Sequence, residues 1–282
     1  RKLPEGDKHN RDLCISLGAC IEHTVTALKY FGMFNSMILS ADFAIDTQTP
    51  VAIFSVQNSS GRDNSLEQLM VAIESRFNAR GPFETKPLSD NMIGVIRDQK
   101  EIDVTCTIIA DQGHLRQFAT LTKDGMKLAH AIPEFRAELA RWMNNNYSGR
   151  KDGIPGYSML AGGIFSLFLP IIIRNFNMGF TLARLNYNSI SSSSGALIFS
   201  SPETPPSWVR VGMLFARISL LCNKVGVRTS VYVASVEIPE VQQRLRNITK
   251  CTDNPQFACS FGYPKLILRQ SPRLSPEERM LQ

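Results

Sequence analysis

The segment "IESRFNARGPF", residues 73–83, places three polar side chains, Arg76, Asn78 and Arg80, at alternate positions beside apolar neighbours. Guanidinium groups offer planar sets of N–H donors that stay charged, and a carboxamide adds a neutral donor, so this set could bind a phosphate group. The alternative is that both arginines are solvated at a helix end, where the helix dipole favours cations. Isolated patterns of this kind are common, so these residues alone leave both interpretations open.

Other residue types give no sign of a metal centre or a nucleotide-binding loop. The histidines, His9, His23, His114 and His130, lack the spacing of metal ligands. No GxGxxG or P-loop sequence is present, so a dinucleotide-binding domain built on either motif is not expected. No side chain is identified as a catalytic acid or base.

The composition is that of an ordinary globular protein with a modest positive charge. The 282 residues are 43% hydrophobic, which is enough for a sizeable core in one large domain or two small ones. The net charge of +6 comes from basic residues spread along the chain without a nucleic-acid-binding signature, so a nucleic-acid partner is not expected. The polar N-terminal residues show no signal-peptide pattern.

The cysteines are scattered without a CxxC pair, and most have apolar neighbours. This arrangement is typical of buried free thiols and favours a reducing compartment, so we expect a cytoplasmic protein. The cysteines are Cys14, Cys20, Cys106, Cys222, Cys251 and Cys259.

One apolar run, residues 159–173, resembles a membrane span in composition. It is shorter than the roughly 20 residues that a spanning helix needs, it contains Pro170, and Arg174 follows it directly. A buried helix or a covering segment is the better interpretation, and a membrane partner is not expected.

Helical periodicity and turn residues divide the chain into alternating helices and strands. Residues 12–30 have apolar side chains at helical spacing, and β-rich sequence follows them. The loop "NSSGRDNS", residues 58–65, is the candidate boundary between two units, and Ser65 with Gln68 predicts a capping box for the next helix. From Gly195 the pattern predicts strand, helix, strand, helix and a final strand.

Two of the expected helices share a glycine spacing. Gly18 and Gly32 are 14 residues apart, as are Gly212 and Gly226, and β-rich sequence follows both pairs. The agreement indicates an internal duplication.

Several ordered segments resemble a known family. "AIESRFNARGPF", "SWVRVGMLFARISLLCNKVGV", "PQFACSFGY" and "SPRLSPEE" resemble the nitroreductase superfamily of FMN-dependent oxidoreductases. "FRAELARW" followed by "DGIPGYSM" is similar to the Acg-type branch, in which two nitroreductase-like units are fused. The resemblance implies an α+β, nitroreductase-like fold that is an internally duplicated pseudo-dimer. Residues 1–65 would be a first unit that is incomplete at its N-terminus, and residues 66–282 a second unit.

The resemblance also implies a cofactor and its phosphate site. In the family, an Arg-x-Ser-x-Arg/Lys pattern holds the FMN phosphate, and it falls here on Arg76, Asn78 and Arg80. Asn replaces the usual Ser, and its amide can still donate to a phosphate oxygen. The family's C-terminal phosphate contacts fall on Ser271 and Arg273 of "QSPRL". Their presence shifts the interpretation of the arginines from solvated cations to a phosphate site.

Further expectations concern the flavin ring. In the family a main-chain N–H of the strand after the long helix approaches N5, and that position is Val233 or Ala234 here. Residues 152–177 are expected to be the lid that Acg-type proteins fold over the flavin. The family's Pro-Ser-x-x-Asn-x-Gln-Pro-Trp segment has no counterpart, so at most one flavin site per chain, built from both units, is expected.

The function that the resemblance implies is electron transfer from NAD(P)H or another donor through FMN to a small acceptor. The flavin itself would perform this chemistry, so no catalytic side chain is required. One alternative is a non-enzymatic protein that stores or sequesters FMN under a lid, and another is a flavin-free interaction protein. The fused duplication predicts a monomer in solution.

Overall fold

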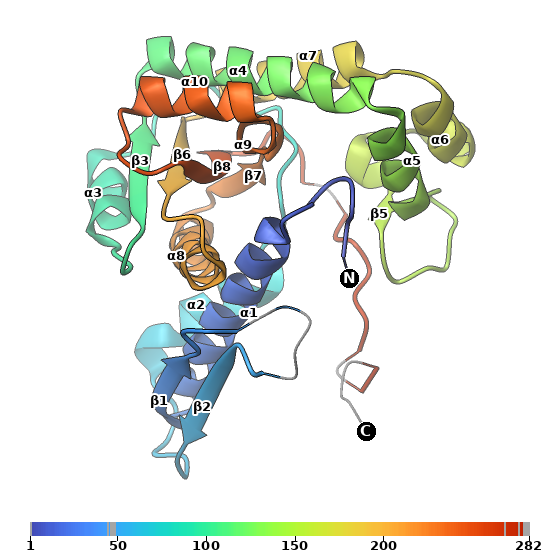
Figure 1. Cartoon of the computed structure of the whole chain (residues 1–282). Coiled ribbons are helices and arrows are strands. Elements are labelled where there is room, and N and C mark those ends of the chain that lie inside the picture. The colour runs from blue at the N-terminus through green and yellow to red at the C-terminus, as the bar shows by residue number, and fades with distance from the viewer. Residues whose placement is uncertain (1, 44, 46–48, 268, 276, 279–282) are drawn as a thin grey trace.

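A four-stranded antiparallel sheet with helices on both faces forms the centre of the chain (Figure 1). The computed structural model describes residues 2–43, 45, 49–267, 269–275 and 277–278. The strand order in the central sheet is β3 (Thr105–Ile109), β6 (Gly195–Ser200), β8 (Pro255–Gly262) and β7 (Arg228–Val231). The predicted α+β class is therefore confirmed.

Both faces of the sheet are covered, and the side chains of β6 alternate between two apolar clusters. Leu197 and Phe199 belong to the cluster on one face, whereas Ala196 and Ile198 belong to the cluster on the other. This alternation follows the two-residue period of a strand. One face is covered by α4 (Gln112–Ala131), α7 (Gly179–Ser192) and α10 (Pro239–Thr249), and the other by α8 (Pro205–Lys224), which packs against α1 (Arg11–Tyr30) (Figure 1).

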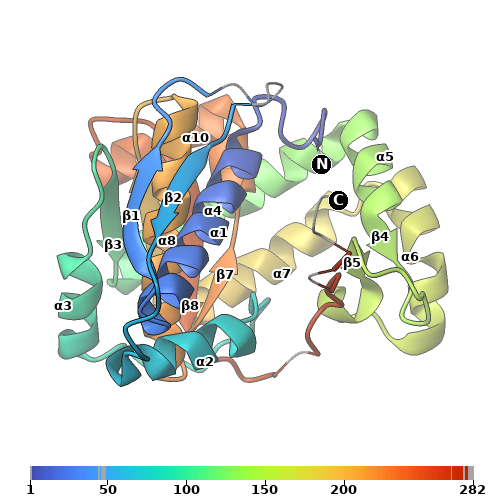
Figure 2. The ribbon, with the colours of Figure 1, turned by 90° about the horizontal axis from the view of Figure 1, so that it is seen from below.

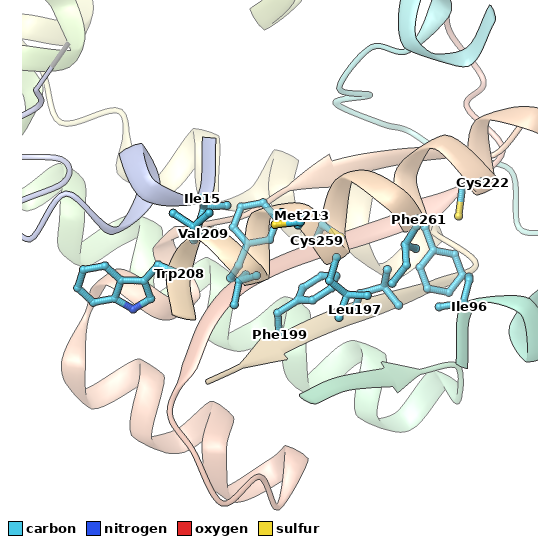
Figure 3. Close-up of a cluster of buried hydrophobic side chains, with 14 of the residues drawn as sticks. Ile15, Ile96, Leu197, Phe199, Trp208, Val209, Met213, Cys222, Cys259 and Phe261 are labelled. Carbon is cyan, nitrogen blue, oxygen red and sulfur yellow. The ribbon is translucent and has the colours of Figure 1, made fainter. Parts of the chain in front are cut away.

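The cluster beneath α8 joins helix and sheet residues far apart in the sequence (Figure 3). Phe199 and Phe261 of the sheet are fully buried there, and Ile96 reaches the cluster from α3 (Asp90–Asp98). Trp208 at the start of α8 donates from its indole nitrogen to Gln256 Oε1 at 3.1 Å, so its polar atom is satisfied within the core. The cluster fixes α8 and the sheet as one rigid support.

Gly18 and Gly212 lie where α1 and α8 cross. A Cβ atom at Gly18 would stand 1.9 Å from the carbonyl oxygen of Val209, and one at Gly212 would stand 1.9 Å from that of Ile15. Only glycine permits this approach of the two backbones. Gly32 and Gly226 follow the two helices with positive φ angles of 64° and 79°. The equal spacing thus corresponds to equal structural roles, while the duplication itself stays a prediction.

Shorter elements surround this centre. Residues 34–39 and 52–56 form a two-stranded antiparallel sheet, and residues 67–75 form a helix, both beside α1. Residues 133–175 form a helical group, and Figures 1 and 2 show the N- and C-terminal segments between this group and α1. These elements are β1 (Phe34–Leu39), β2 (Ala52–Val56), η1 (Asn64–Leu66), α2 (Glu67–Ser75), α5 (Pro133–Trp142), β4 (Met143–Asn144), β5 (Ile154–Pro155), η2 (Gly156–Met159), α6 (Gly163–Asn175) and α9 (Ala234–Glu237).

Two sequence predictions need correction. Ser65 was predicted to be the N-cap of α2, but it lies within η1, and the N-cap of α2 is Leu66, which makes no side-chain cap hydrogen bond. The N-cap of η1 is Asp63, whose carboxylate accepts from Ser65 N–H at 3.0 Å. Free thiols are confirmed for all the cysteines, and Cys14, Cys222 and Cys259 are buried, but Cys20 is exposed on α1. The unit boundary near residue 65 remains a prediction.

No single helix among the described residues is long and apolar enough to cross a membrane. The consecutive helices α6 and α7 have that length and composition only when taken together, and they are bent by 112° relative to each other.

The helix crossing generates a stability prediction. Gly212→Ala should lower the free energy of unfolding by about 1–3 kcal/mol, because the added methyl group overlaps the Ile15 carbonyl and forces α1 away from α8. The matched control is Gly94→Ala in α3, where an added Cβ has no atom within 4 Å. That change should leave stability unchanged or raise it by up to about 1 kcal/mol. Denaturant unfolding measures both, and equal effects would contradict the tight crossing.

Candidate functional site

The segment after α2 is fixed to the edge strand β7. Arg76 leaves the helix in an extended conformation, with φ −64° and ψ 140°. Ala79 N–H donates to the carbonyl oxygen of Thr229 at 2.9 Å, and Asn78 Oδ1 accepts from Val231 N–H at 3.0 Å. The acceptor end of the Asn78 carboxamide is thereby occupied, and its Nδ2 forms no hydrogen bond with any described residue. Nδ2 therefore stays available as a donor.

Gly81 lets this segment lie close to α7. Its φ angle is +64°, and a Cβ atom at this position would stand 2.0 Å from Ser189 Oγ. The same hydroxyl accepts a 2.7 Å hydrogen bond from Tyr232 Oη, just after β7. Gly81, α7 and the end of β7 therefore hold Arg80 in one position.

The C-terminal segment completes a pocket with residues 76–80. The pocket has a volume of about 150 Å³, and all of the residues predicted to bind a phosphate line it. They are Arg76, Asn78, Arg80, Ser271 and Arg273. Residues almost two hundred positions apart in the sequence thus meet at one site.

The pocket concentrates positive charge that the protein does not neutralise. Within the described part of the chain, neither Arg76 nor Arg80 forms an ion pair with a carboxylate. Arg273 donates to two backbone carbonyls, those of Ser271 at 3.2 Å and Pro272 at 3.4 Å. Like charges held this close favour the binding of an anion.

The pKa values of the two arginines follow from this arrangement. Desolvation lowers the pKa of Arg76, and the neighbouring charge of Arg273 lowers it further. Desolvation also lowers the pKa of Arg80, while Tyr232 acts in the opposite direction. The side chain of Arg80 has an exposed surface and lines both the cationic pocket and the larger cavity beside it. Arg76 is half-buried, and neither cation has a carboxylate partner among the described residues.

A larger, mainly apolar cavity of about 600 Å³ adjoins the cationic pocket. Asn78, Arg80 and Ile154 line both spaces, so the two are continuous. Met126, Ala129 and His130 of α4 and Leu182 and Asn186 of α7 form one wall, and residues 230–239 form another. Such a space suits a flat, largely apolar ring system attached to an anionic group.

Val233 and Ala234 were predicted to lie beside the flavin ring on a strand. They line the larger cavity, but they do not lie within a strand. The strand β7 ends at Val231, and α9 begins at Ala234. Tyr232 N–H still pairs with Ala258 O at 2.9 Å, and Ser235 Oγ donates back to Tyr232 O at 3.1 Å, which turns the chain into α9. The predicted strand continuation is therefore wrong at these two residues.

Helix α1 also contributes to the site. Arg11 is buried, pairs with the Glu237 carboxylate and donates to Val236 O at 3.2 Å, which ties α1 to α9. Asp12 and Val233 line an adjacent cavity of about 510 Å³. Burial raises the pKa of the Asp12 carboxyl to about 7, and the nearby carboxylate of Glu237 adds to the effect.

Two further residues of the cationic pocket were not identified from the sequence. Arg269 lines the pocket and lies over the ring of Tyr157, 5.4 Å from its centroid, and Ser158 lines the same pocket. A signal for Arg269 exists, because Arg269, Ser271 and Arg273 repeat the alternate spacing of the first segment. Ser158 lies in the segment 152–177 that the resemblance predicts to be a lid over the flavin, but it was not predicted to line the phosphate pocket.

The segment predicted to be a lid contributes only in part to the cavity walls. Gly153, Ile154, Ser158 and Met159 line the cationic pocket or the cavities next to it. Helix α6 instead packs against α5, and its outer face is exposed. Whether residues 152–177 act as a lid remains a prediction. Among the described residues, no group of three or more His, Cys, Asp or Glu side chains could hold a metal ion.

The comparison with known proteins rests on structure. No family model matches the chain, and no curated protein matches its sequence. A variant of the FMN- and NADPH-dependent nitroreductase NfnB from Sphigopyxis sp. strain HMH superposes with a TM-score of 0.50 at 13% identity, covering 76% of this chain and 98% of its own. The chain has a nitroreductase-like fold. At this identity the likeness establishes the fold alone.

A second solved structure is similar at a lower score. The FMN-dependent nitroreductase NfnB from Mycobacterium smegmatis, in complex with NADPH, has a TM-score of 0.49 at 10% identity, with 78% of this chain and 99% of that chain covered.

The positive charge of Arg76 generates a prediction for the pKa of His23 on α1. Burial lowers the pKa of His23 to about 4, and the positive charge of Arg76 contributes to this. Arg76→Gln removes a cation that disfavours the imidazolium, so the pKa of His23 should rise. An NMR titration of the histidine resonances measures it. Arg116→Gln, at an exposed position of α4, is the control and should have no effect. An unchanged pKa of His23 in Arg76→Gln would contradict this electrostatic effect.

Proposed function

We propose that the chain is an FMN-binding oxidoreductase of nitroreductase type. The observation that carries the proposal is the shared pocket of Arg76, Asn78, Arg80, Ser271 and Arg273. These residues belong to two distant sequence motifs, and an FMN phosphate site requires them to lie together in one pocket.

The pocket fits a phosphate monoester in its donor set. The doubly charged phosphate would meet three guanidinium groups, and the free Nδ2 of Asn78 and the hydroxyl of Ser271 add neutral donors. An anion there would relieve the repulsion between Arg76 and Arg273. The cofactor would therefore compensate a charge that the fold leaves unbalanced.

The adjoining apolar cavity is the proposed place of the isoalloxazine ring. When bound, the flavin would supply hydride and electron transfer between a donor such as NAD(P)H and a small acceptor. The side chains of Met126, Leu182 and Val233 would exclude water from the ring, and the backbone at Val233 and Ala234 would orient it. The protein's role is thus to bind, orient and shield.

We further propose that the chain is an internal pseudo-dimer of the Acg type and monomeric. The α1–β1 unit of residues 1–65 would correspond to α8–β7 in the unit of residues 66–282. Support comes from the reciprocal glycine contacts of α1 and α8, and from the contact of Arg11 with α9 beside the proposed ring site. A homodimer in light scattering would count against the monomer.

A second candidate is a protein that stores or sequesters FMN without turnover. The enclosure of the site by Ile154, Ser158 and Met159 supports it, because a segment that stays closed would exclude substrates. The two candidates share the binding site and differ only in access to the ring.

Phosphate recognition is tested by comparing FMN with riboflavin, which lacks the phosphate. The purified protein should bind FMN more tightly than riboflavin, as measured by flavin fluorescence quenching. Arg76→Ala and Arg273→Ala should each weaken FMN binding roughly tenfold to a hundredfold, since hydrogen bonds to charged groups contribute about 1.5–3 kcal/mol.

Riboflavin binding should change little in either variant, and Arg116→Ala should affect neither ligand. Equal losses for both flavins would indicate a folding defect, so circular dichroism of each variant accompanies the measurement. FMN binding that is unchanged in both arginine variants would contradict the phosphate assignment.

Anaerobic addition of NADPH or NADH to the FMN-loaded protein separates the two candidates. Bleaching of the flavin absorbance bands is the expected result for an oxidoreductase. Bound flavin that resists these donors and yet is bleached by dithionite would favour storage. Failure to take up FMN at all would contradict both and favour a flavin-free interaction protein.

A further inference from the structure

The exposed face of α6 is unusually apolar for a protein surface. Ile164, Phe165, Leu167, Phe168 and Ile171 have relative exposures of 74%, 51%, 45%, 55% and 59%. They occupy neighbouring positions on one side of the helix at helical spacing. We call these five residues the α6 outer face. Contiguous exposed apolar patches of this kind mark interaction sites.

The opposite side of α6 already has a partner. Leu169 and Ile173 are buried in a cluster with Ala140 and Met143 at the end of α5, and Ser166 is fully buried between them. The α6 outer face is therefore a second apolar side of the helix, and it is not needed for packing against α5. The interpretation of residues 159–173 as a buried or covering segment is correct for one side of the helix only.

The segment that carries this face has charges of one sign only. Residues 153–202 contain no Asp or Glu, and Arg174 and Arg184 are their only charged residues. Beyond the end of α6, Phe176 and Phe180 are 62% and 67% exposed, and Lys127 Nζ lies 5.5 Å from the Phe180 ring centroid. Exposed aromatic and aliphatic side chains bordered by cations are typical of segments that adsorb to anionic membrane surfaces.

We infer that the α6 outer face docks on the surface of a lipid bilayer that carries anionic headgroups. Its apolar side chains enter the boundary between headgroups and acyl chains, and Arg174, Arg184 and Lys127 face the lipid phosphates. This goes beyond the proposed flavin chemistry, does not depend on it, and departs from the expectation of no membrane partner.

The helix lies on the membrane and does not cross it. Its 13 residues span about 20 Å, less than the roughly 30 Å of a hydrocarbon core. Its inner side is occupied by α5, so only the outer face is free to enter lipid.

A second copy of the chain fits this face less well. A symmetric contact would place the same patch on both sides, so Arg174 and Arg184 of one copy would approach those of the other, and residues 153–202 offer no carboxylate to pair with them. An anionic lipid surface provides the missing negative charge.

Flotation with lipid vesicles tests the inference on the full chain. We expect binding to vesicles of equimolar phosphatidylserine and phosphatidylcholine, weaker binding to phosphatidylcholine alone, and loss of binding at high salt. Phe165→Gln/Phe168→Gln should weaken binding about tenfold or more, because two apolar side chains no longer enter the lipid. Arg174→Glu/Arg184→Glu should remove the preference for anionic vesicles.

The matched control is Ile38→Gln/Ile53→Gln, a cross-strand pair on β1 and β2 with relative exposures of 66% and 54%. It should bind vesicles like the unchanged protein, and thermal unfolding should show that all variants are folded. Absence of binding to either vesicle by the unchanged protein would overturn the inference. So would a dimer in light scattering that Phe165→Gln/Phe168→Gln dissociates, since a second copy would then cover the face.

Discussion

The candidate site depends on arginine side chains that lie close together and form no ion pair with a carboxylate of the described residues. Arg76, Arg80 and Arg273 line one small pocket. Desolvation disfavours the charged forms of Arg76 and Arg80, and the charge of Arg273 adds to this effect at Arg76. Such an arrangement costs folding free energy in the absence of an anion. Binding of an anion offsets that cost, which links stability to occupancy of the site. The proposed cofactor follows from this constraint more directly than from any single residue.

Rigid elements hold the charges in place. The edge of the central sheet fixes the first motif through the contacts of Ala79 with Thr229 and of Val231 with Asn78. The second motif comes from the C-terminal segment, which runs past α2, where Gln270 Nε2 donates to Glu74 O at 3.2 Å. A site assembled from separate segments on a packed sheet keeps its geometry better than one on a single loop.

Local patterns predicted much of the fold and part of the site. The pattern of apolar residues was sufficient to predict α1, α8 and β6, because buried residues extend along each of these elements. Helix α4 was missed because Gly125 and several polar residues weaken its pattern. Gly125 is required by packing, since a Cβ there would stand 2.1 Å from Ala234 O. Val233 and Ala234 were placed on a strand because "VYVAS" has β-branched residues, whereas tertiary contacts turn the chain there into α9.

The phosphate motifs could be predicted because both segments resemble a known family, since the spacing of Arg76 and Arg80 alone is common and left two interpretations open. Arg269 was not predicted although it repeats that spacing, and Ser158 was predicted only as part of the lid segment, because the fold alone brings it to the phosphate pocket. The most direct test of the central claim is a crystal structure of the protein with FMN. We expect phosphate density within hydrogen-bonding distance of Arg76, Arg80 and Arg273, with the ring beside Val233. A phosphate bound elsewhere, with these arginines directed to solvent, would contradict it.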